Sequence, residues 1–231
     1  MSGGTAVVTG AAGGLGGRIG ERLAAAGHEL LLADLDPAVE EVAAAQGARA
    51  VVADLTKAEG VEAVAAAAGE DVAVLVNNAG ITRDARAAKM SAEDFAAVIE
   101  INLVAAMRLT LALEPRYRDG AAVVNLSSRA ALGNFGQANY SASKSGLVGF
   151  GRALAQQWAP RVRVNAVAPS LVDTPMTQAM PPEVLEKMVA RIPAGRIGTP
   201  DDVAGIVAFL VSPEAAYVTG QVLFACGGRS V

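Results

Sequence analysis

The sequence predicts a doubly wound α/β fold: about seven parallel strands in one sheet, with helices on both faces. Short apolar runs recur along the chain, and most end at Gly, Asp or Asn before a segment with helical spacing. Strands that alternate with helices form right-handed βαβ units, whose strands are parallel. The length of 231 residues fits one domain of this kind. We find no linker, repeat or second domain, so we expect a single domain over residues 1–231.

The first predicted strand, Thr5–Thr9, is followed at once by a glycine-rich loop. The strand is apolar and β-branched, which is typical of a buried strand. Gly10, Gly14 and Gly16 lie in the loop, and helical spacing begins at Arg18. Glycines let the backbone approach a pyrophosphate, and the free N–H groups of a helix start favour an anion. The pattern predicts a dinucleotide phosphate site, against the alternative of a flexible turn.

Three further strands in the first half also end in polar residues. They cover residues 30–34, 50–53 and 72–76. Asp34 ends the first of these, where a carboxylate can accept hydrogen bonds from adenosine ribose hydroxyls and repels a 2′-phosphate. We therefore favour NAD over NADP, with NADP and a helix-capping role for Asp34 as open alternatives. The last strand leads into Asn77-Asn78-Ala79-Gly80, at the strand ends where such sheets bind ligands, although turns favour the same residues.

A helix is predicted to begin at Ser91, because a capping hydroxyl is followed three residues later by the acid Asp94. This helix contains Asn102 among apolar neighbours. A buried amide needs hydrogen-bond partners, so Asn102 is either a structural bridge or part of a site.

The remaining strands and one more helix start lie in the second half of the chain. The strands cover residues 123–126, 162–167 and 221–225, and the helix starts at Thr199-Pro200. The segment of about 171–198 is less regular, with five prolines between Pro169 and Pro193 and several methionines. We interpret it as a mobile substrate lid. A surface helical hairpin docked by the same methionines is an equally weighted alternative.

Tyr140 and Lys144 lie four residues apart on a predicted helix, so their side chains share one face. A phenol loses its proton near pH ~10, and an adjacent ammonium lowers that pKa towards neutrality. The pair could therefore act as a proton donor and acceptor. A chance pairing of surface residues is the alternative.

Composition excludes several classes of function. The formal net charge of −4 is unsuited to binding nucleic acid through its phosphates. The apolar runs are shorter than the ~20 residues that a membrane span requires, and the N-terminus lacks a signal-peptide pattern. The single cysteine, Cys226, cannot form an internal disulfide, which favours the cytoplasm. The single His28 has no second histidine to share a metal, so we expect no metal site.

The motifs, taken together, resemble those of the short-chain dehydrogenase/reductase family. They are Thr9-Gly10-x-x-x-Gly14-x-Gly16, Asn77-Asn78-Ala79-Gly80, Asn102, Ser127 and Tyr140-x-x-x-Lys144, in the family's order. The chain is most similar to the 3-oxoacyl-acyl-carrier-protein reductases, through residues 77–84, 133–140, 191–198 and 214–220. The resemblance implies a Rossmann-like fold, nicotinamide chemistry and a homotetramer built through the helices around Asn102 and Tyr140 and the last strand.

The resemblance also implies residue roles. Tyr140 would donate a proton to the substrate carbonyl oxygen as a hydride reaches its carbon, and Lys144 would lower the pKa of Tyr140. Ser127 would hydrogen-bond the same oxygen, and Asn102 would hold a water that links Lys144 to solvent. The implied cofactor contacts are Gly10, Gly14, Leu15, Gly16, Asp34, Leu35, Asp54, Leu55, Asn78, Ala79, Gly80, Tyr140, Lys144, Val172 and Thr174.

Two departures from the carrier-protein reductases bear on function. Gly13 stands where NADPH-dependent members have a basic residue, which agrees with NAD, and Pro169-Ser170 replaces the usual Pro-Gly. Arg118 and Arg161 fall near positions where such reductases have basic residues for the acidic carrier protein. Acyl carrier protein is therefore a candidate partner, and simple solvated surface charge is the alternative.

We therefore expect an NAD(P)-dependent oxidoreductase that reduces a ketone, with a 3-oxoacyl thioester carried by acyl carrier protein or CoA as the first hypothesis. One alternative is a dehydrogenase of a free small secondary alcohol, sugar or cyclic ketone. A regulator that binds NAD without turnover is the alternative from another class. A regulator of that kind would be expected to lack one or more catalytic residues. This chain retains all four of them, Asn102, Ser127, Tyr140 and Lys144.

Overall fold

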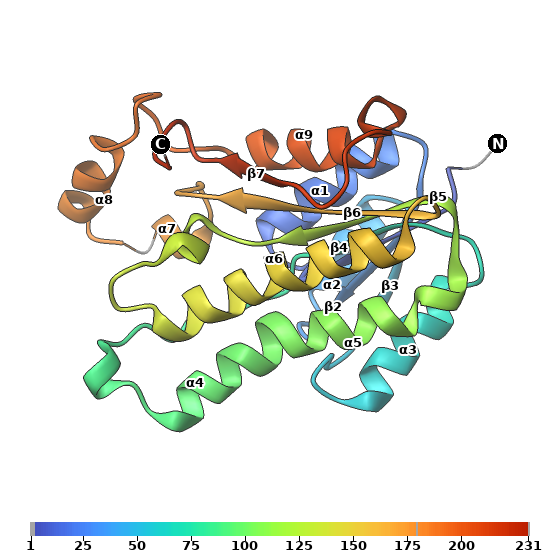
Figure 1. Ribbon diagram of the computed structural model, residues 1–231, viewed down its shortest axis with the longest axis horizontal. Helices are drawn as coiled ribbons and strands as arrows, with labels where there is room; N and C mark the ends of the chain where they lie inside the picture. The colour runs from blue at the N-terminus through green and yellow to red at the C-terminus, as the bar shows by residue number, and fades with distance from the viewer. Residues whose placement is uncertain (1–2, 179, 231) are drawn as a thin grey trace.

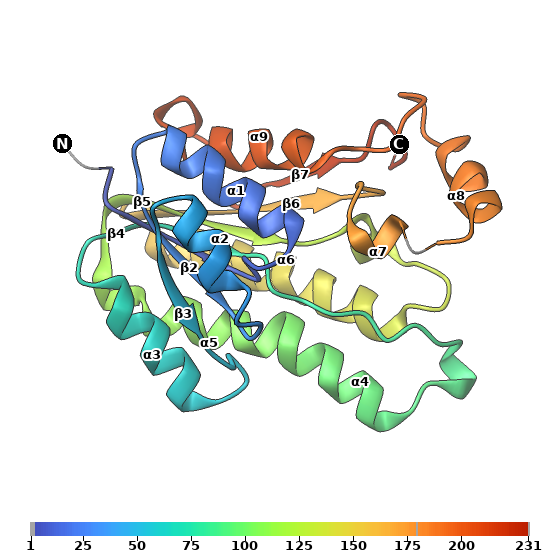
Figure 2. The same cartoon turned by 180° about the vertical axis from the view of Figure 1, so that it is seen from behind.

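The centre of the molecule is a parallel sheet of seven strands in the order β3-β2-β1-β4-β5-β6-β7 (Figures 1 and 2). The computed structural model describes residues 3–178 and 180–230. The strands are β1 (Thr5–Thr9), β2 (Glu29–Asp34), β3 (Arg49–Val52), β4 (Val72–Asn77), β5 (Tyr117–Leu126), β6 (Val162–Pro169) and β7 (Val222–Ala225). All neighbouring strands pair in parallel. The predicted doubly wound, single-domain Rossmann-like fold is confirmed.

The strand order reverses at β1, which pairs with β2 on one side and with β4 on the other. The chain leaves β1 and builds outward to β3, then crosses back and builds outward in the opposite direction to β7. At such a reversal the connections diverge from the two neighbouring strands, which leaves a crevice at their carboxyl ends. The fold therefore directs the loops after β1 and β4 to one crevice.

Helices cover both faces of the sheet, and each face has its own apolar core. One face packs against α1 (Gly14–Ala25), α2 (Val39–Ala45) and α9 (Pro200–Val211), the other against α3 (Ala58–Ala68), α5 (Ala105–Ala112) and α6 (Ala138–Trp158) (Figure 1). Helix α4 (Ala92–Ile99) lies outside this layer and packs on α6. Ile19, Leu23 and Leu210 are buried in the first core. Leu109 and Trp158 are buried in the second. Strands buried on both faces explain why their sequences are continuous apolar runs.

Helices α4 and α5 form one continuous helix, Ala92–Ala112, through a π-helical turn at Glu100–Val104 (η2). The helix has 21 residues, and a stretch of 18 of them has a mean hydropathy of 1.7, so it matches a membrane span by length and composition; only 28% of that stretch is buried. The sequence analysis did not identify such a segment, because Glu100 and Arg108 interrupt its apolar run. Length and composition alone are weak support for a span, since core helices of soluble proteins share them. Here the helix packs beside α3 and α6.

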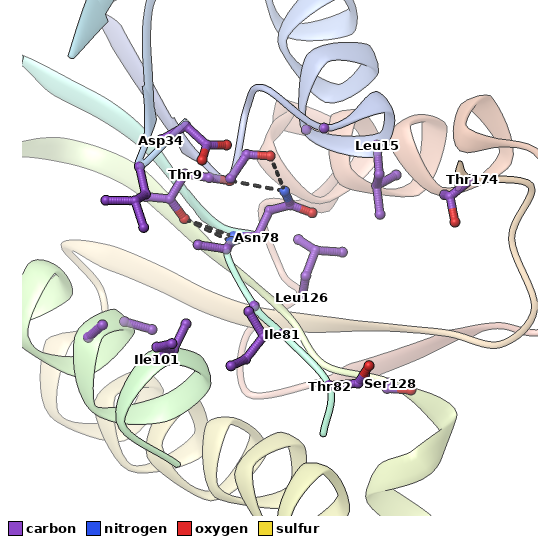
Figure 3. A pocket seen from close by; sticks show the side chains of 18 of the residues that line it. Thr9, Leu15, Asp34, Asn78, Ile81, Thr82, Ile101, Leu126, Ser128 and Thr174 are labelled. Carbon is purple, nitrogen blue, oxygen red and sulfur yellow. Dashed lines mark hydrogen bonds between the residues drawn. The ribbon is translucent and has the colours of Figure 1, made fainter. Parts of the chain in front are cut away.

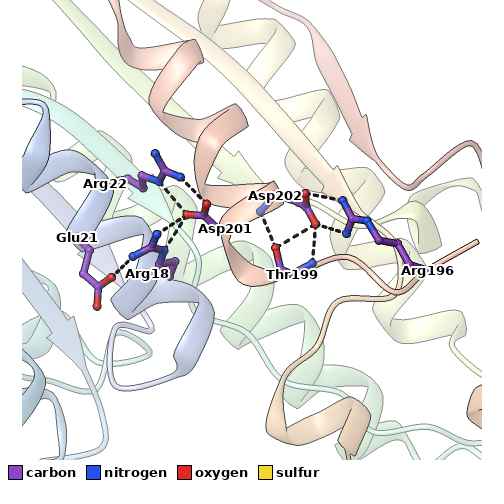
Figure 4. A network of polar contacts seen from close by, with 7 residues as sticks. All are labelled: Arg18, Glu21, Arg22, Arg196, Thr199, Asp201 and Asp202. Carbon is purple, nitrogen blue, oxygen red and sulfur yellow. Dashed lines mark hydrogen bonds and ion pairs between the residues drawn. The ribbon is translucent and has the colours of Figure 1, made fainter. Parts of the chain in front are cut away.

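The predicted start of α9 at Thr199 is confirmed by a capping box. The Thr199 hydroxyl accepts from the Asp202 N–H (3.1 Å), and the Asp202 carboxylate accepts from the Thr199 N–H (2.7 Å). Asp201, next to it, accepts hydrogen bonds from Arg22 and Arg18 of α1, which hold the pKa of Asp201 down at about 2 (Figure 4). Side chains on both sides of these pairs are exposed enough for solvent to screen them, so they add little to the stability of the fold. Their main effect is to align α9 with α1.

The segment predicted as a lid, about 171–198, contains the short helices α7 (Pro175–Gln178) and α8 (Pro182–Val189). Both lie beyond the carboxyl ends of the strands (Figure 1). Ala179, within this segment, lies outside the described residues. The position agrees with a lid and with a helical hairpin, and the lid stays a prediction.

Arg163 in β6 offers a test of how the end of α9 is held. Its guanidinium donates to the carbonyls of Leu210 (2.6 Å), Ser212 (3.3 Å) and Val218 (3.4 Å). We expect Arg163→Met to lower the free energy of unfolding by about 2 kcal/mol, because partly buried carbonyls lose a charged donor. Urea unfolding measures this change. The exposed Arg152→Met on α6 is the control and should change stability by less than ~0.5 kcal/mol; equal losses would contradict the assignment.

Candidate active site

A cavity of about 890 Å³ lies at the carboxyl ends of the strands, beside the reversal in strand order (Figure 3). Every residue predicted to contact a cofactor lines this cavity, and so does Ser127. These are Gly10, Gly14, Leu15, Gly16, Asp34, Leu35, Asp54, Leu55, Asn78, Ala79, Gly80, Tyr140, Lys144, Val172 and Thr174. Asn102 does not line it and is completely buried behind it. The fold therefore brings residues from both halves of the chain to one site.

The glycine loop is shaped by close backbone contacts. Gly10 has φ +66°, and a Cβ there would lie 2.7 Å from Cα of Ala79. A Cβ on Gly16 would overlap the carbonyl oxygen of Gly10. A Cβ on Gly14, by contrast, would meet nothing within 4 Å. Bare backbone at the start of α1 thus lines the cavity, as binding a pyrophosphate at a helix N-terminus requires.

Thr9 and Asn78 lock the loop after β4 onto the glycine loop (Figure 3). The Asn78 amide donates to the carbonyls of Thr9 (3.0 Å) and Gly10 (2.9 Å). The Thr9 hydroxyl accepts from the N–H groups of Asn78 and Ala79, both at 3.1 Å. The sequence analysis missed this role of Thr9, although Thr9 begins the glycine motif. A hydroxyl at the last position of a strand beside a crevice was the available signal.

The Asp34 carboxylate lies on the rim of the cavity and braces the glycine loop. Its Oδ2 accepts from the Ala12 N–H (2.9 Å) and its Oδ1 from the Asp36 N–H (3.0 Å). Asp34 does not cap α2: Ala38 precedes that helix, and its N–H donates to Asp36 instead (2.9 Å). An ionised carboxylate only accepts hydrogen bonds, so its remaining lone pairs suit the hydroxyls of a ribose.

Lys144 and Tyr140 share one face of α6, as predicted, and Lys144 is buried. Lys144 Nζ lies 5.5 Å from the centre of the Tyr140 ring and donates to the Leu126 carbonyl (2.7 Å). Burial lowers the pKa of Lys144 to about 8. Burial also raises the pKa of Tyr140, and the Ser128 hydroxyl only partly offsets it. The expectation of a lowered Tyr140 pKa is therefore wrong for this structure, since desolvation exceeds the stabilisation of the phenolate.

Two adjacent hydroxyls, Ser127 and Ser128, line the cavity where β5 ends. Ser127 Oγ donates to the Lys144 carbonyl (2.9 Å), which ties β5 to α6. The Ser128 hydroxyl is the one that affects the pKa of Tyr140, and it accepts from the Ala130 N–H (3.1 Å). Ser127 alone was predicted from the sequence as a catalytic hydroxyl, and Ser128 was not. The pair of consecutive hydroxyls was the signal for Ser128.

Asn102 lies in the π-helical turn η2 and bridges three segments. Its Oδ1 accepts from the Ile81 N–H (2.8 Å), and its Nδ2 donates to the Ile81 carbonyl (2.9 Å) and to Ser143 Oγ (3.2 Å). The amide thus joins the strand end after Gly80 to the turn before α5 and to α6. Asn102 is therefore a structural bridge, which was one of the two alternatives that the sequence allowed. A π-helical turn is common at functional sites, and the role of Asn102 in a water relay stays a proposal.

Arg118 and Arg161, the predicted carrier-protein contacts, lie far from the cavity within this chain. Both stand at the amino ends of β5 and β6, whereas the cavity lies at the carboxyl ends. Arg118 pairs with Asp71 (3.1 Å), and Arg161 donates to the carbonyls of Tyr117 (3.1 Å) and Glu114 (3.3 Å). A carrier that bound these two arginines would therefore dock at the opposite end of the sheet from the site in the same chain.

No group of three or more His, Cys, Asp or Glu side chains that could hold a metal ion occurs in residues 3–178 and 180–230. His28 instead contacts the Gly3 carbonyl through Nδ1 at 2.8 Å. Cys226 is a free, partly exposed cysteine in the turn after β7.

Comparison with known proteins connects this site to characterised sequences. A family profile described as Enoyl-(Acyl carrier protein) reductase matches residues 10–230. The 3-oxoacyl-[acyl-carrier-protein] reductase of Thermotoga maritima is 46% identical over 157 residues, 66% of this chain and 63% of that protein. The chain spans 63% to 66% of the length of the first curated relatives it matches.

Two solved structures from Brucella melitensis cover the whole chain at 34% identity. One, a "Short-chain dehydrogenase/reductase SDR:Glucose/ribitol dehydrogenase", superposes with a TM-score of 0.96 over 98% of its own chain. The other, a 3-ketoacyl-(acyl-carrier-protein) reductase complexed with NADH, has a TM-score of 0.92 over 99% of its chain. The likeness thus extends over the sheet, both helical layers and the segment after β6.

The glycine loop allows a matched test. We expect Gly16→Ala to lower the melting temperature and weaken dinucleotide binding, because the methyl group would overlap the Gly10 carbonyl, at a cost of about 1–3 kcal/mol. Gly14→Ala should leave the melting temperature unchanged or slightly raised, since its methyl group meets open space. Thermal melts of both variants, with and without NADH, measure the difference. Equal destabilisation by both substitutions would refute the packing argument.

Proposed function

The chain belongs to the short-chain dehydrogenase/reductase family, and from that membership we propose that it is a nicotinamide-dependent oxidoreductase that reduces the 3-oxo group of an acyl thioester. The observation that supports this most strongly is one cavity lined by a glycine loop at one end and by Ser127, Tyr140 and Lys144 at the other. The names of the relatives, a 3-oxoacyl reductase and a 3-ketoacyl reductase, support the substrate class.

We propose NAD(H) as the cofactor. The backbone of Gly14 to Gly16 would hold the pyrophosphate, and Asp34 would accept from the adenosine ribose hydroxyls. Asp54 and Leu55 would contact the adenine, and Val172 and Thr174 the nicotinamide end. When bound, the nicotinamide supplies the hydride in reduction and accepts it in oxidation. The NADH in the similar Brucella melitensis structure supports this cofactor.

The proton chemistry belongs to Tyr140. Its pKa is raised by burial, so the phenol is protonated at neutral pH and can donate a proton to the carbonyl oxygen of the substrate. The hydroxyls of Ser127 and Ser128 line the same cavity and can hydrogen-bond that oxygen as negative charge develops on it. Lys144, with a pKa of about 8, is still largely charged at pH 7 and stabilises the phenolate that remains.

Proton return to Tyr140 would use the buried residues behind it. Lys144 Nζ and the Asn102 amide both lie close to Gly80: a Cβ at Gly80 would be 3.4 Å from the first and 3.2 Å from Asn102 Oδ1. Lys144 Nζ and Asn102 Oδ1 thus lie on the same side of Gly80, where a side chain would otherwise stand. A water between these groups and solvent would let Lys144 hand a proton to the phenolate, which is the role we propose for Asn102.

A dehydrogenase of a free small alcohol or sugar is the second candidate. One of the two similar Brucella melitensis proteins is called a glucose/ribitol dehydrogenase, which favours this candidate. So does the distance of Arg118 and Arg161 from the cavity, because a carrier protein bound there would dock at the far end of the sheet. A regulator without turnover fits less well, because Ser127, Tyr140 and Lys144 lie together in the cavity.

We propose a homotetramer built in part through the helix Ala92–Ala112 and α6. The helix is strongly apolar, yet only 28% of its most apolar 18-residue stretch is buried in one chain. Phe95 is 39% and Leu111 46% exposed along it. An apolar surface of this kind is characteristic of a subunit interface. Acyl carrier protein stays a proposed partner.

Replacement of the proton donor tests the mechanism. We expect Tyr140→Phe to reduce kcat for acetoacetyl-CoA reduction by at least about a hundredfold, because the carbonyl oxygen loses its acid. Tyr217→Phe, which alters a fully exposed phenol, is the matched control and should keep full activity. Initial-rate kinetics measure both variants. Activity that survives in Tyr140→Phe would exclude Tyr140 as the donor.

The Asp34 carboxylate tests the cofactor choice. We expect the wild-type protein to prefer NADH to NADPH with acetoacetyl-CoA, because the carboxylate repels a 2′-phosphate. Asp34→Asn should shift the ratio of kcat/KM values towards NADPH by at least about tenfold, a change of ~1.4 kcal/mol. Asp119→Asn, at an exposed position in β5, is the control. A wild-type preference for NADPH would refute the Asp34 argument.

A further inference from the structure

Arg129 and Arg229 are in contact beside the cavity, and Arg191 lies in the segment that packs against the turn containing Arg229; the proposed chemistry uses none of the three. Arg129 begins the 3₁₀ helix η4 (Arg129–Leu132), Arg191 follows α8, and Arg229 lies in the turn after β7. Arg229 Nη1 donates to Ser170 Oγ (3.2 Å), and Ser170 lines the cavity. Arg129 Nε donates to the carbonyl of Arg229 (3.3 Å). All three segments lie at the carboxyl end of the sheet (Figure 1).

The charges of this cluster are not balanced within the described part of the chain. Arg18, Arg22 and Arg196 each pair with a carboxylate there, but Arg129, Arg191 and Arg229 do not. Arg129 and Arg229 are also partly buried. Burial, together with the charges of Arg129 and Arg191, lowers the pKa of Arg229. Partly desolvated like charges repel one another, and an anion among them removes that repulsion.

The backbone around the cluster is rigidly packed. Gly227 and Gly228 have φ +60° and +89°, so the turn that ends at Arg229 uses conformations open to glycine. A Cβ on Gly227 would lie 2.7 Å from Cγ2 of Ile192, and the Gly227 carbonyl accepts from the Ala194 N–H (2.9 Å). The turn is thus packed against the segment that follows Arg191. The arginines are therefore brought together by the fold rather than by mobile side chains alone.

We propose that Arg129, Arg191 and Arg229 form an anion-binding subsite for a carboxylate or phosphate group of the substrate. Guanidinium groups suit both, because their planar N–H groups bind two oxygens at once. This subsite rests on the proposed function, since it assumes that the substrate enters beside Ser128 and Ser170. The subsite adds one requirement to the proposed reaction: the substrate should carry a negatively charged group.

The position limits where the anion lies on the substrate. Arg129 directly follows Ser128, and Ser170 directly follows Pro169; Ser128, Pro169 and Ser170 line the cavity, as does Tyr140. Because Arg129 adjoins Ser128 and Arg229 donates to Ser170, the subsite adjoins the part of the cavity that these two serines line. The carboxylate of a short oxo acid reaches such a subsite directly, whereas a CoA phosphate must fold back to it. The two sources predict different substrates.

The first experiment compares three ketones that differ in charge. They are acetoacetate with a carboxylate, acetoacetyl-CoA with phosphates, and the neutral thioester acetoacetyl-N-acetylcysteamine. The test protein is the double variant Arg129→Gln/Arg229→Gln. Its KM should rise about ten- to hundredfold for whichever anionic ketone the enzyme reduces, while kcat should change little. KM for the neutral thioester should not change. Arg229→Lys should recover part of the loss, and Arg152→Gln, which removes an exposed charge on α6, should behave as wild type.

The pattern of these results identifies the source of the anion and can overturn the subsite. A selective effect on acetoacetate assigns the carboxylate of an oxo acid, and a selective effect on acetoacetyl-CoA assigns a phosphate; both support the subsite. An equal rise in KM for the neutral thioester would overturn it, because the arginines would then act on the shape of the site. Unchanged KM for every ketone would overturn it as well.

A second measurement does not depend on turnover. With NAD filling the proposed pyrophosphate site, inorganic phosphate should raise the melting temperature of the wild-type protein and of Arg152→Gln further, because a ligand stabilises the folded state that binds it. It should raise the melting temperature of Arg129→Gln/Arg229→Gln much less. Protection that is lost in the double variant, without turnover of any ketone, would support the subsite and reject the proposed reaction. Equal protection of all three proteins would overturn the subsite.

Discussion

The contact between the glycine loop after β1 and the loop after β4 is the constraint on which the site depends. Gly10 and Gly16 have no room for a Cβ, and the Asn78 amide and Thr9 hydroxyl join the two loops through four hydrogen bonds. The reversal of strand order leaves space there, and the glycines let backbone rather than side chains line it. The rest of the cavity is arranged around this contact.

Burial determines the acid-base properties of the site more than neighbouring charge does. Lys144 donates its hydrogen bond to the Leu126 carbonyl, and the same low-dielectric surroundings lower its pKa and raise that of Tyr140. Both shifts favour the neutral forms of Lys144 and Tyr140. A charge that arrives with a ligand would therefore have a large effect on the pKa values of these two residues. This sensitivity is suited to proton transfer that occurs only when the site is filled.

Segments far apart in sequence complete the mouth of the cavity. The Asp201 pairs align α9 with α1 below the glycine loop, while the turn after β7 packs on the segment after α8 (Figure 4). Arg129, Arg191 and Arg229 are close because these segments meet. The proposed anion subsite thus depends on contacts between distant elements, whereas the proposed cofactor site depends on two local loops.

The sequence by itself determined the strands, their parallel pairing and the predicted cofactor contacts that line the cavity, because these follow from local apolar runs, glycines and polar strand ends. Only the tertiary structure decided the rise in the Tyr140 pKa, the bridge made by Asn102 and the pairing of Ser128 with Tyr140. It also decided that Arg118 lies at the far end of the sheet while Arg129 and Arg229 meet at the cavity. Desolvation and through-space charge depend on packing between distant segments, and no spacing along the chain records that packing.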